Sequence, residues 1–532
     1  DNFIYSLKRS DLLSNRTIDA DVIQAKKLLY IFPVIFYLVA VLIILTSISQ
    51  LIHREAKNIG LLKALGFKKS EILKHYINIF IVLGLIGSIL GIILGPIIVP
   101  SVMGRKYNIL YQLPNISLPF FRWEYLISVG LLLIIIVLVS IFACRNAMNM
   151  VPAASLRGEN AVSMKISFLD HFSFMKKIPL AILMAFRNMK RKISRTLMVL
   201  LGVMGCSALL VCGFGIEDTI NYGIDLELEE LIPYDLSLTY GTFDSKKYIL
   251  NEKEEITDYD EYAKYTISIE KESMISSYIY LLPSELKVFK VDCGKNDCII
   301  SSKVAEEIKA KVGDEIHFVY QNKTYDTKIS KVVDFCISQG IFMTSDTFDI
   351  PFEPTGAWLN TKAGTNNEDL AEELKMESGI ASVLTITQMK ERAEDILASI
   401  KVMTWTIKIF AILLAVVVLY NLALLNFKER IKDIATLKVL GFSRFEVASS
   451  LMIEIIFLTF IGALVGLALG YPLLVSVLSI NENPLLSYIY HINFSSYCLT
   501  VLITCGSSLF INLIFAILTN KVQMVESLKS VE

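Results

Sequence analysis

The sequence predicts an α-helical polytopic membrane protein with seven spans and one extracytoplasmic α+β domain. Hydrophobic residues make up 54% of the 532 residues and charged residues only 19%, against about 25% charged in soluble proteins. Charge is nearly absent from seven long windows and concentrated between them, which is the pattern of a polytopic membrane protein. One stretch of the chain is repeated, and one long polar insert separates the two copies.

Each apolar window is long enough to cross a hydrocarbon core, which takes roughly 20 helical residues. The predicted spans are residues 28–52, 76–99, 125–144, 196–216, 402–425, 451–474 and 498–518. Lys and Arg are concentrated after the first, third and fifth spans. Because basic loops stay in the cytoplasm, these loops and the C-terminus are expected there. Residues 1–27 and 217–400 are then expected outside the cell membrane. The Ile- and Lys-rich composition is a hint of a low-GC bacterium.

The polar segments complete the domain organisation. Residues 1–27 are interpreted as the end of a first external domain with its stalk helix, and residues 217–400 as a further external domain. Residues 159–195 are a cytoplasmic linker that ends in a basic amphipathic helix, typical of a helix lying on anionic lipid. Relative to the second half, the first half lacks such a helix, one span and most of an external domain. We therefore expect eight spans in the intact protein.

Within the insert, alternating or β-rich patterns predict strands at Asp314–Tyr320 and Thr327–Val333, and apolar periodicity predicts helices at Lys303–Gly313 and Asn367–Glu377.

The repeated stretch is REAKNIGLLKALGFKKSE at residues 54–71, which returns without a gap as ERIKDIATLKVLGFSRFE at 429–446. Apolar residues three apart form one stripe of each predicted helix. Gly66 and Gly441 stand where a left-handed C-cap is expected. A helix resting on lipid headgroups is one interpretation, but the duplicated LGF turn favours docking to a cytoplasmic partner. The predicted docking residues are Ile59, Leu62, Lys63, Leu65, Gly66, Phe67, Ile434, Leu437, Lys438, Leu440, Gly441 and Phe442.

A glycine stripe is repeated as well, in the second and sixth predicted spans. Its members are Gly87, Gly91 and Gly95 in the first copy and Gly462, Gly466 and Gly470 in the second. Glycine at every fourth position lets two helix backbones approach closely. We interpret the stripes as helix-packing faces; a substrate-conducting surface is the alternative.

Two charged residues stand within or at the ends of predicted spans, Lys408 and Glu454. Intramembrane ionisable residues can mark functional sites. Because both are within about two turns of a span edge, we expect them to snorkel to the interface.

The sequence has no motif for catalysis or for a bound metal or cofactor. It contains no GxxxxGK[ST] loop for ATP, no HExxH and no GxSxG, so an enzyme and a self-contained ATPase are not supported. Cys293 and Cys298 are a candidate disulfide pair if the insert lies outside. A zinc site is less well supported, since no second CxxC or nearby His pair accompanies them. Nucleic-acid binding does not fit basic segments that adjoin membrane spans.

These motifs resemble the FtsX-like permeases of ABC transporters, a group that includes MacB-like and LolC/LolE-like proteins. The repeated loops are similar to the family's REIxxLKALG loop. AFRNMKRKISRTLMVLLGV at Ala185–Val203 is similar to the family's approach to its first span, and VPAASLR at Val151–Arg157 to its PxExLR end. CIISSKVAEEIKAKVGDEIHFV at Cys298–Val319 is similar to a stretch of MacB-like external domains.

The resemblance implies two FtsX-like membrane units, residues 28–158 and 401–532, and a MacB-like external domain at 217–400. It implies that the repeated loops are coupling helices that contact a separate cytoplasmic ABC ATPase dimer, which binds ATP and Mg. Closure of the ATPase pair would move the stalk helices and reshape the external domains, a mechanism called mechanotransmission. The protein would then be a permease subunit for export or extraction of a peptide or lipid-linked substrate.

The alternative function is a non-transporting regulator of a cell-wall enzyme or a sensor kinase. The other expected partners are membrane lipid and an external protein, peptide or lipid ligand. Asn58 stands where the second copy has Asp433, nearer to the Glu common in the family, so the second copy is predicted to dock more strongly. With two units in one chain, monomer and dimer both remain open.

Overall fold

The computed structural model describes separate positions between 33 and 52 and then residues 55–111, 123–149, 193–241, 250–429 with short gaps, 439, 441, 444–481 and 487–520. The chain divides into two compact units. The helical unit comprises residues 30–215, 402–474 and 493–532, and the sheet-rich unit comprises residues 1–29, 216–401 and 475–492.

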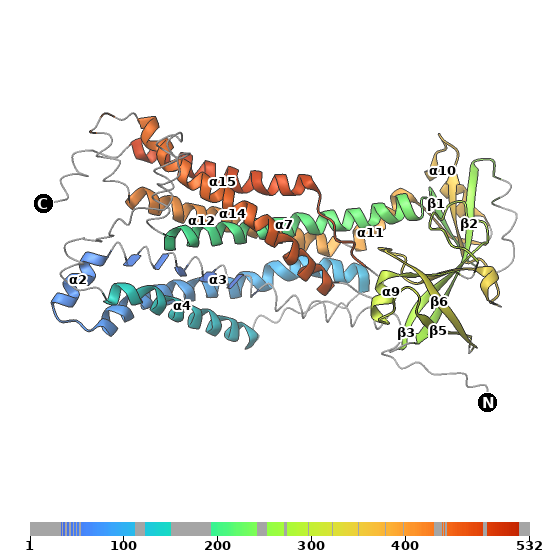
Figure 1. The fold of residues 1–532 in the computed structure, drawn as a ribbon, viewed down its shortest axis with the longest axis horizontal. Helices are drawn as coiled ribbons and strands as arrows, with labels where there is room; N and C mark the ends of the chain where they lie inside the picture. Colours follow the sequence, from blue (N-terminus) through green and yellow to red (C-terminus); the bar gives the residue numbers. More distant parts are fainter. Residues whose placement is uncertain are drawn as a thin grey trace. The chain divides into compact units, whose positions relative to one another are not determined.

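The helical unit consists of long apolar helices (Figure 1). Its elements are α2 (Ala56–Ala64), α3 (Lys69–Tyr111), α4 (Trp123–Asn149), the first part of α7 (Ile193–Asp225), most of α12 (Ala398–Glu429), most of α14 (Arg444–Asn481) and most of α15 (Phe494–Asn520). A helix satisfies its own backbone hydrogen bonds, which is why such apolar segments form helices in lipid.

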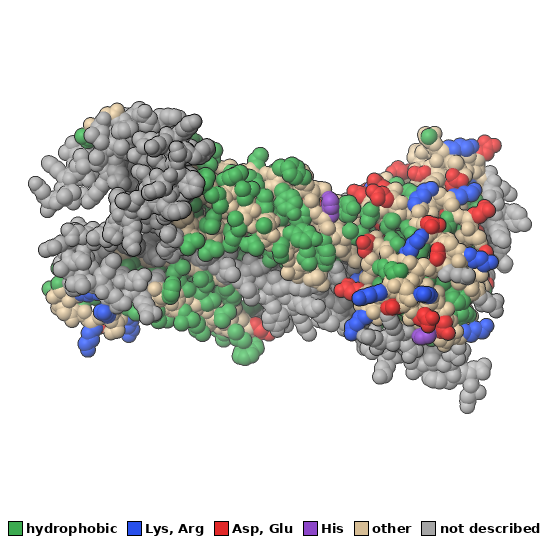
Figure 2. All heavy atoms as spheres, in the orientation of Figure 1, with side chains coloured by type: hydrophobic (Ala, Val, Ile, Leu, Met, Phe, Trp, Pro, Cys, Tyr) green, Lys and Arg blue, Asp and Glu red, His purple; other side chains and the backbone are tan. Residues whose placement is uncertain are grey.

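In the described part of the chain, five helices are long and apolar enough to cross a membrane. They are Lys69–Ile97, Trp123–Phe142, Val199–Leu231, Met452–Ser479 and Phe494–Phe515, and α12 adds a shorter apolar stretch, Ile407–Asn421. Figure 2 shows hydrophobic side chains over much of the described surface of these helices. The protein is thus a multi-pass membrane protein. Most of the first predicted span lies outside the described residues, so the total of seven stays a prediction.

A hydrophobic core joins α7, α12, α14 and α15, with Val203, Leu419, Ile455 and Phe515 among its buried members. The prediction that Lys408 and Glu454 snorkel to an interface is wrong. Lys408 is only 5% exposed and Glu454 is fully buried. The Lys408 ammonium lies 4.3 Å from the ring centroid of Phe214. Its stem fits against α7 because Gly213 has no side chain there: a Cβ on Gly213 would lie 2.9 Å from Lys408 Cγ.

The sheet-rich unit contains nine described strands in one continuous set of pairings. They are β1 (Leu236–Tyr240), β2 (Ile256–Glu270), β3 (Met274–Leu282), β4 (Cys298–Ser301), β5 (Glu315–Tyr320), β6 (Lys323–Val333), β7 (Ile341–Thr344), β8 (Gly356–Thr361) and β9 (Ile380–Thr385). The helical elements of this unit include α9 (Ser302–Glu307), α10 (Asn367–Met376), α11 (Ile386–Ile396) and a π-helical turn, η4 (Leu226–Leu231).

Six of these strands close into a barrel. The pairing runs β2–β3–β7–β4–β6–β5 and returns to β2 through the contact of Ser268–Glu270 with His317–Val319. Closure leaves no unpaired edge. The interior is filled by apolar side chains, among them Ile267, Ile300 and Phe318.

The long strand β2 leaves the barrel at its other end and joins a second, open sheet of order β2–β8–β1–β9. All three pairings are antiparallel, and this strand order is that of a ferredoxin-like βαββαβ sheet, with the barrel inserted between its second and third strands. Helix α10 lies between β8 and β9 in the chain and packs Leu370 and Leu374 against Leu238, Leu359 and Val383.

The strand and helix predictions for the insert hold at β5, β6 and α10. The helix predicted at residues 303–313 is shorter and ends at Glu307. Lys309 adopts a left-handed φ of 53°, and the N–H of Ala310 donates to the carbonyl of Ala305 at 2.8 Å. That six-to-one bond is a helix terminator, so the apolar periodicity continues past the end of the helix.

Candidate coupling helix and stalk junction

The first copy of the repeated stretch folds as helix α2, followed by a tight turn and then α3. Gly66 has a φ of +90°, the left-handed conformation that glycine adopts at low cost. The N–H of Phe67 donates to the carbonyl of Leu62 and that of Gly66 to Lys63, both at 3.1 Å. These two bonds form a Schellman motif, which fixes the direction of Leu65 and Phe67.

The side chains of this helix divide between two faces. Ile59 is 1% exposed and packs with Ile52, Ile72 and Tyr76, with Leu62 packed against them. Leu65 is 68% exposed and Phe67 52% exposed. Ile59 and Leu62 therefore hold α2 against its own unit, and the surface available to a partner is narrower than the predicted stripe. Leu61, Leu65 and Phe67 are the large apolar side chains exposed there.

Two polar residues of this helix also have defined surroundings. Lys63 is half-buried, and its pKa is lowered by burial and by the nearby charge of Lys69. The side-chain amide of Asn58 donates to Glu55 at 2.6 Å on the exposed side. Asn58 thus satisfies a neighbouring carboxylate of the same helix, whereas Asp433 cannot donate in this way.

The second copy lies mostly outside the described residues, which leaves Ile434, Leu437, Lys438, Leu440 and Phe442 without a structural description. Gly441 has a φ of +89°, nearly the value of Gly66 and as the C-cap prediction requires. Val439, two residues before it, is exposed.

The two glycine stripes have different surroundings. In α14, a Cβ on Gly462, Gly466 or Gly470 would lie 2.9 Å, 1.7 Å or 2.4 Å from the nearest atoms of Val203, Ser207 and Val211 respectively. Helices α14 and α7 are thus in backbone-close contact along the whole stripe. Gly87, Gly91 and Gly95 of α3 have no such atom within 4 Å in the described part of the chain.

In the sheet-rich unit, one carboxylate joins the end of α7 to the sheets. Glu227 is fully buried in η4 and accepts backbone N–H groups from Cys336 at 2.7 Å, Ile337 at 2.6 Å and Ser338 at 3.0 Å. Burial raises its pKa above 4.5, and hydrogen bonds from these three N–H groups and from the Ser338 side chain oppose that rise. We call residues 335–340 the hub loop. A π-helical turn at this point is noteworthy because such turns are often found at functional sites.

The hub loop also contacts two other segments of this unit. Its Cys336 carbonyl accepts the N–H of Ser487, from the connection between α14 and α15, at 3.1 Å. The same connection is bound to α7, since Thr219 donates its hydroxyl to the carbonyl of His491 at 2.9 Å and Tyr222 stacks on the His491 ring at 4.2 Å. The hub loop, the end of α7 and this connection are therefore held together.

A lysine joins the C-terminal end of α7 and the following η4 turn to helix α11. Lys390 Nζ lies 2.8 Å from Asp225 Oδ1 and 2.7 Å from Glu229 Oε1. Helix α11 leads along the chain into α12, with which the chain returns to the helical unit. The segments by which the chain enters and leaves the sheet-rich unit are thus clamped to each other by one side chain.

Cys293 and Cys298 are free, buried thiols in the structure. Burial raises the pKa of Cys293 to about 11 and that of Cys298 to about 12, so neither thiol is activated. Their pairing stays a prediction. No group of three or more His, Cys, Asp or Glu that could hold a metal occurs in the described residues.

Sequence reasoning missed Glu227, because LELEEL looks like a solvated acidic run. A signal was present, however. Ile216, Ile220 and Ile224 of α7 are buried at spacings of four, and Glu227 follows three residues later on the same helical face. An acidic residue that continues an apolar stripe is the sign of a carboxylate bound by the protein's interior.

Comparison with known proteins gives a family and two relatives. The family model for the FtsX-like permease C-terminal region matches residues 30–152 and again 405–524. An uncharacterized ABC transporter permease of Methanocaldococcus jannaschii is 24% identical over 332 residues, covering 55% of this chain and 83% of the relative. The match to the periplasmic region of MacB from Actinobacillus actinomycetemcomitans covers 32% of this chain and 97% of that structure, at 10% identity and a TM-score of 0.23.

Proposed function

Because the chain belongs to the FtsX-like permease family of ABC transporters, we propose that it is a permease subunit driven by a separate cytoplasmic ATPase. The ATPase, with ATP and Mg, docks on the two repeated loops and moves the sheet-rich unit on the outer side of the membrane. The observation that carries the proposal is the turn at Gly66. It is rigid, it presents Leu65 and Phe67 to solvent, and it is anchored inward by Ile59.

The path of the motion follows from the contacts of α7. The same helix packs along α14 through the glycine stripe and continues into η4, where Glu227 binds the hub loop. Lys390 holds α11, and so the start of α12, to that end of α7. A shift of α7 or α12 is thus delivered to the hub loop, from which the barrel strand β7 begins. Rigid packing transmits such shifts because packed interfaces have few intermediate arrangements.

The test is whether the exposed turn binds an ATPase. Phe67→Asp should abolish co-purification of the partner ATPase with this chain and the stimulation of ATP hydrolysis. The control is Val312→Asp, which places the same charge on an apolar side chain that is exposed in the sheet-rich unit. Equal association of wild type and Phe67→Asp would refute the coupling assignment, and equal loss in both variants would indicate general damage.

The substrate class we propose is a peptide or a lipid-linked molecule, exported or extracted by movement of the sheet-rich unit. The alternative function, regulation of a cell-wall enzyme or a sensor kinase, predicts a different binding partner for the moving unit. Capture of a hydrolase or kinase by the intact protein in nanodiscs, dependent on ATP, would favour regulation. ATP-dependent release of a lipid or peptide would favour transport.

A further inference from the structure

One groove in the sheet-rich unit gathers polar side chains from three elements. Its volume is about 400 Å³, which is within the range of small-molecule binding sites. The polar members of its lining are Lys375 of α10, Ser382 of β9, and Gln388, Glu391 and Arg392 of α11. All of them except Glu391 can donate hydrogen bonds. The groove is therefore lined mainly by donors.

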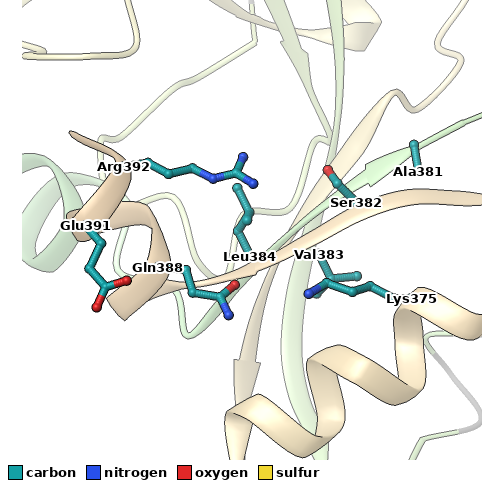
Figure 3. A pocket seen from close by; sticks show the side chains of 8 residues that line it. All are labelled: Lys375, Ala381, Ser382, Val383, Leu384, Gln388, Glu391 and Arg392. Atoms are coloured by element: carbon teal, nitrogen blue, oxygen red, sulfur yellow. The ribbon is translucent and has the colours of Figure 1, made fainter. Parts of the chain in front are cut away.

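The two cations of the groove are not neutralised by the protein. Lys375 and Arg392 are both exposed, and neither forms an ion pair within the described residues. The glutamates two positions before and after Lys375 are paired with Lys253 instead. In Figure 3 the two cationic side chains extend toward β9 from opposite sides, whereas Glu391 extends away from Arg392. The groove thus presents net positive charge, and a cleft with one sign of charge concentrates ions of the other sign.

The charge and the donors of this groove fit a phosphate monoester. Such a group carries a charge of about −1.5 to −2 at pH 7 and three strong acceptor oxygens. The planar guanidinium of Arg392 is suited to bind two of these oxygens at once, and the ammonium of Lys375 supplies a second cation. A single carboxylate has only two oxygens and one charge, so it would leave one cation without a counter-charge.

We propose that this groove binds a phosphate monoester, with Lys375 and Arg392 on its oxygens and Ser382 and Gln388 as further donors. The group belongs either to a soluble phosphate or to the head group of a lipid, since the same atoms are recognised in both. The inference does not depend on the coupling to an ATPase, because the site lies in the sheet-rich unit and its occupancy is measured without ATP.

A ligand in the groove would join α10 to α11. Lys375 lies near the end of α10, and Arg392 follows two residues after Lys390, which holds α11 to Asp225 and Glu229. The bound phosphate therefore connects the open sheet to a helix that is already clamped to the end of α7. Local opening of α11 becomes less frequent when the groove is occupied, so amide exchange in this helix should slow.

The test is isothermal titration calorimetry of the full-length protein in phosphatidylcholine nanodiscs, at constant ionic strength because salt screens exposed charges. Glycerol 3-phosphate should bind with a Kd below about 1 mM, and succinate, a dianion that offers only carboxylates, at least about tenfold more weakly. Dihexanoyl phosphatidic acid carries the same phosphate on acyl chains. Binding about tenfold tighter than that of glycerol 3-phosphate identifies a lipid head group as the source, and equal affinity identifies a soluble phosphate.

The protein variant is Lys375→Gln with Arg392→Gln, which should weaken the binding of glycerol 3-phosphate at least about tenfold. Its matched control, Lys323→Gln with Lys328→Gln, removes the same charge from exposed lysines of the barrel and should leave the Kd unchanged. Equal melting temperatures of the two variants and the wild type show that all three fold alike.

Four results would overturn the proposal. They are a Kd of glycerol 3-phosphate above about 1 mM, succinate binding as tight as phosphate binding, equal weakening in the control variant, and a bound phosphate that leaves amide exchange in α11 unchanged. The last result would place the phosphate outside the groove.

Discussion

Replacing Glu227 by Gln should loosen the hub loop. The carboxylate takes two N–H groups on Oε2 and one on Oε1. A carboxamide keeps one oxygen, so if that oxygen takes the Oε2 position, its NH₂ group faces the N–H of Ser338. One buried donor then has no acceptor, which costs about 1–3 kcal/mol. If the loop opens locally, amide exchange at residues 336–338 should accelerate by roughly 5- to 150-fold.

Hydrogen exchange of the purified protein, followed by mass spectrometry of the peptides that span residues 335–340, measures this directly. The control is Glu230→Gln, the same chemical change at an exposed position of the same turn. The reasoning is refuted if Glu227→Gln leaves exchange in the hub loop unchanged, or if Glu230→Gln accelerates it equally. In the first case the three short contacts would contribute no net stability.

Three further outcomes follow from the same contacts. Gly466→Ala should lower the free energy of unfolding by about 1–3 kcal/mol, because its Cβ would lie 1.7 Å from Ser207 Oγ and 2.7 Å from the Met204 carbonyl oxygen. Gly91→Ala, at a position with open space, should leave it unchanged. Equal melting temperatures of the two variants would contradict the close contact of α14 with α7. Lys390→Met should cost under about 1 kcal/mol, because the two carboxylates are more than half exposed and solvent screens them, but it should reduce cross-linking between cysteines placed on α7 and α11; unchanged cross-linking would exclude the clamp. Because the pKa of Glu227 is raised by burial, its stabilising contribution is complete below pH 4.5 and is lost as pH rises through the folded pKa. The melting temperature of the wild type should therefore fall as pH rises above 4.5, and Glu227→Gln should remove this dependence. The same pH dependence in both proteins would refute the prediction.

The membrane character and helix α10, which packs on the open sheet, could be predicted from the sequence because they depend on local composition and periodicity. The closure of the barrel could not be predicted. Strands β4 and β7 are four residues long, and their partners are set by contacts between residues far apart in the chain. β2 belongs to two sheets at once, which alternation along a single strand does not reveal. Glu227 was hidden for a related reason: its three partners are backbone groups more than 100 residues away.

Comparison of the two repeated halves shows which structural features depend on the local sequence and which depend on the segments packed against it. Gly66 and Gly441 adopt φ values of +90° and +89°, because the LGF turn at a helix end is a local matter. The glycine stripes are equally alike in sequence. Along the α14 stripe an added Cβ would meet atoms of α7, whereas along the α3 stripe it would meet no described atom within 4 Å. Close approach requires a second helix with small or β-branched residues in register, here Val203, Ser207 and Val211. The stripe supplies the capacity to pack, and the segment placed against it determines whether the two helices come into close contact.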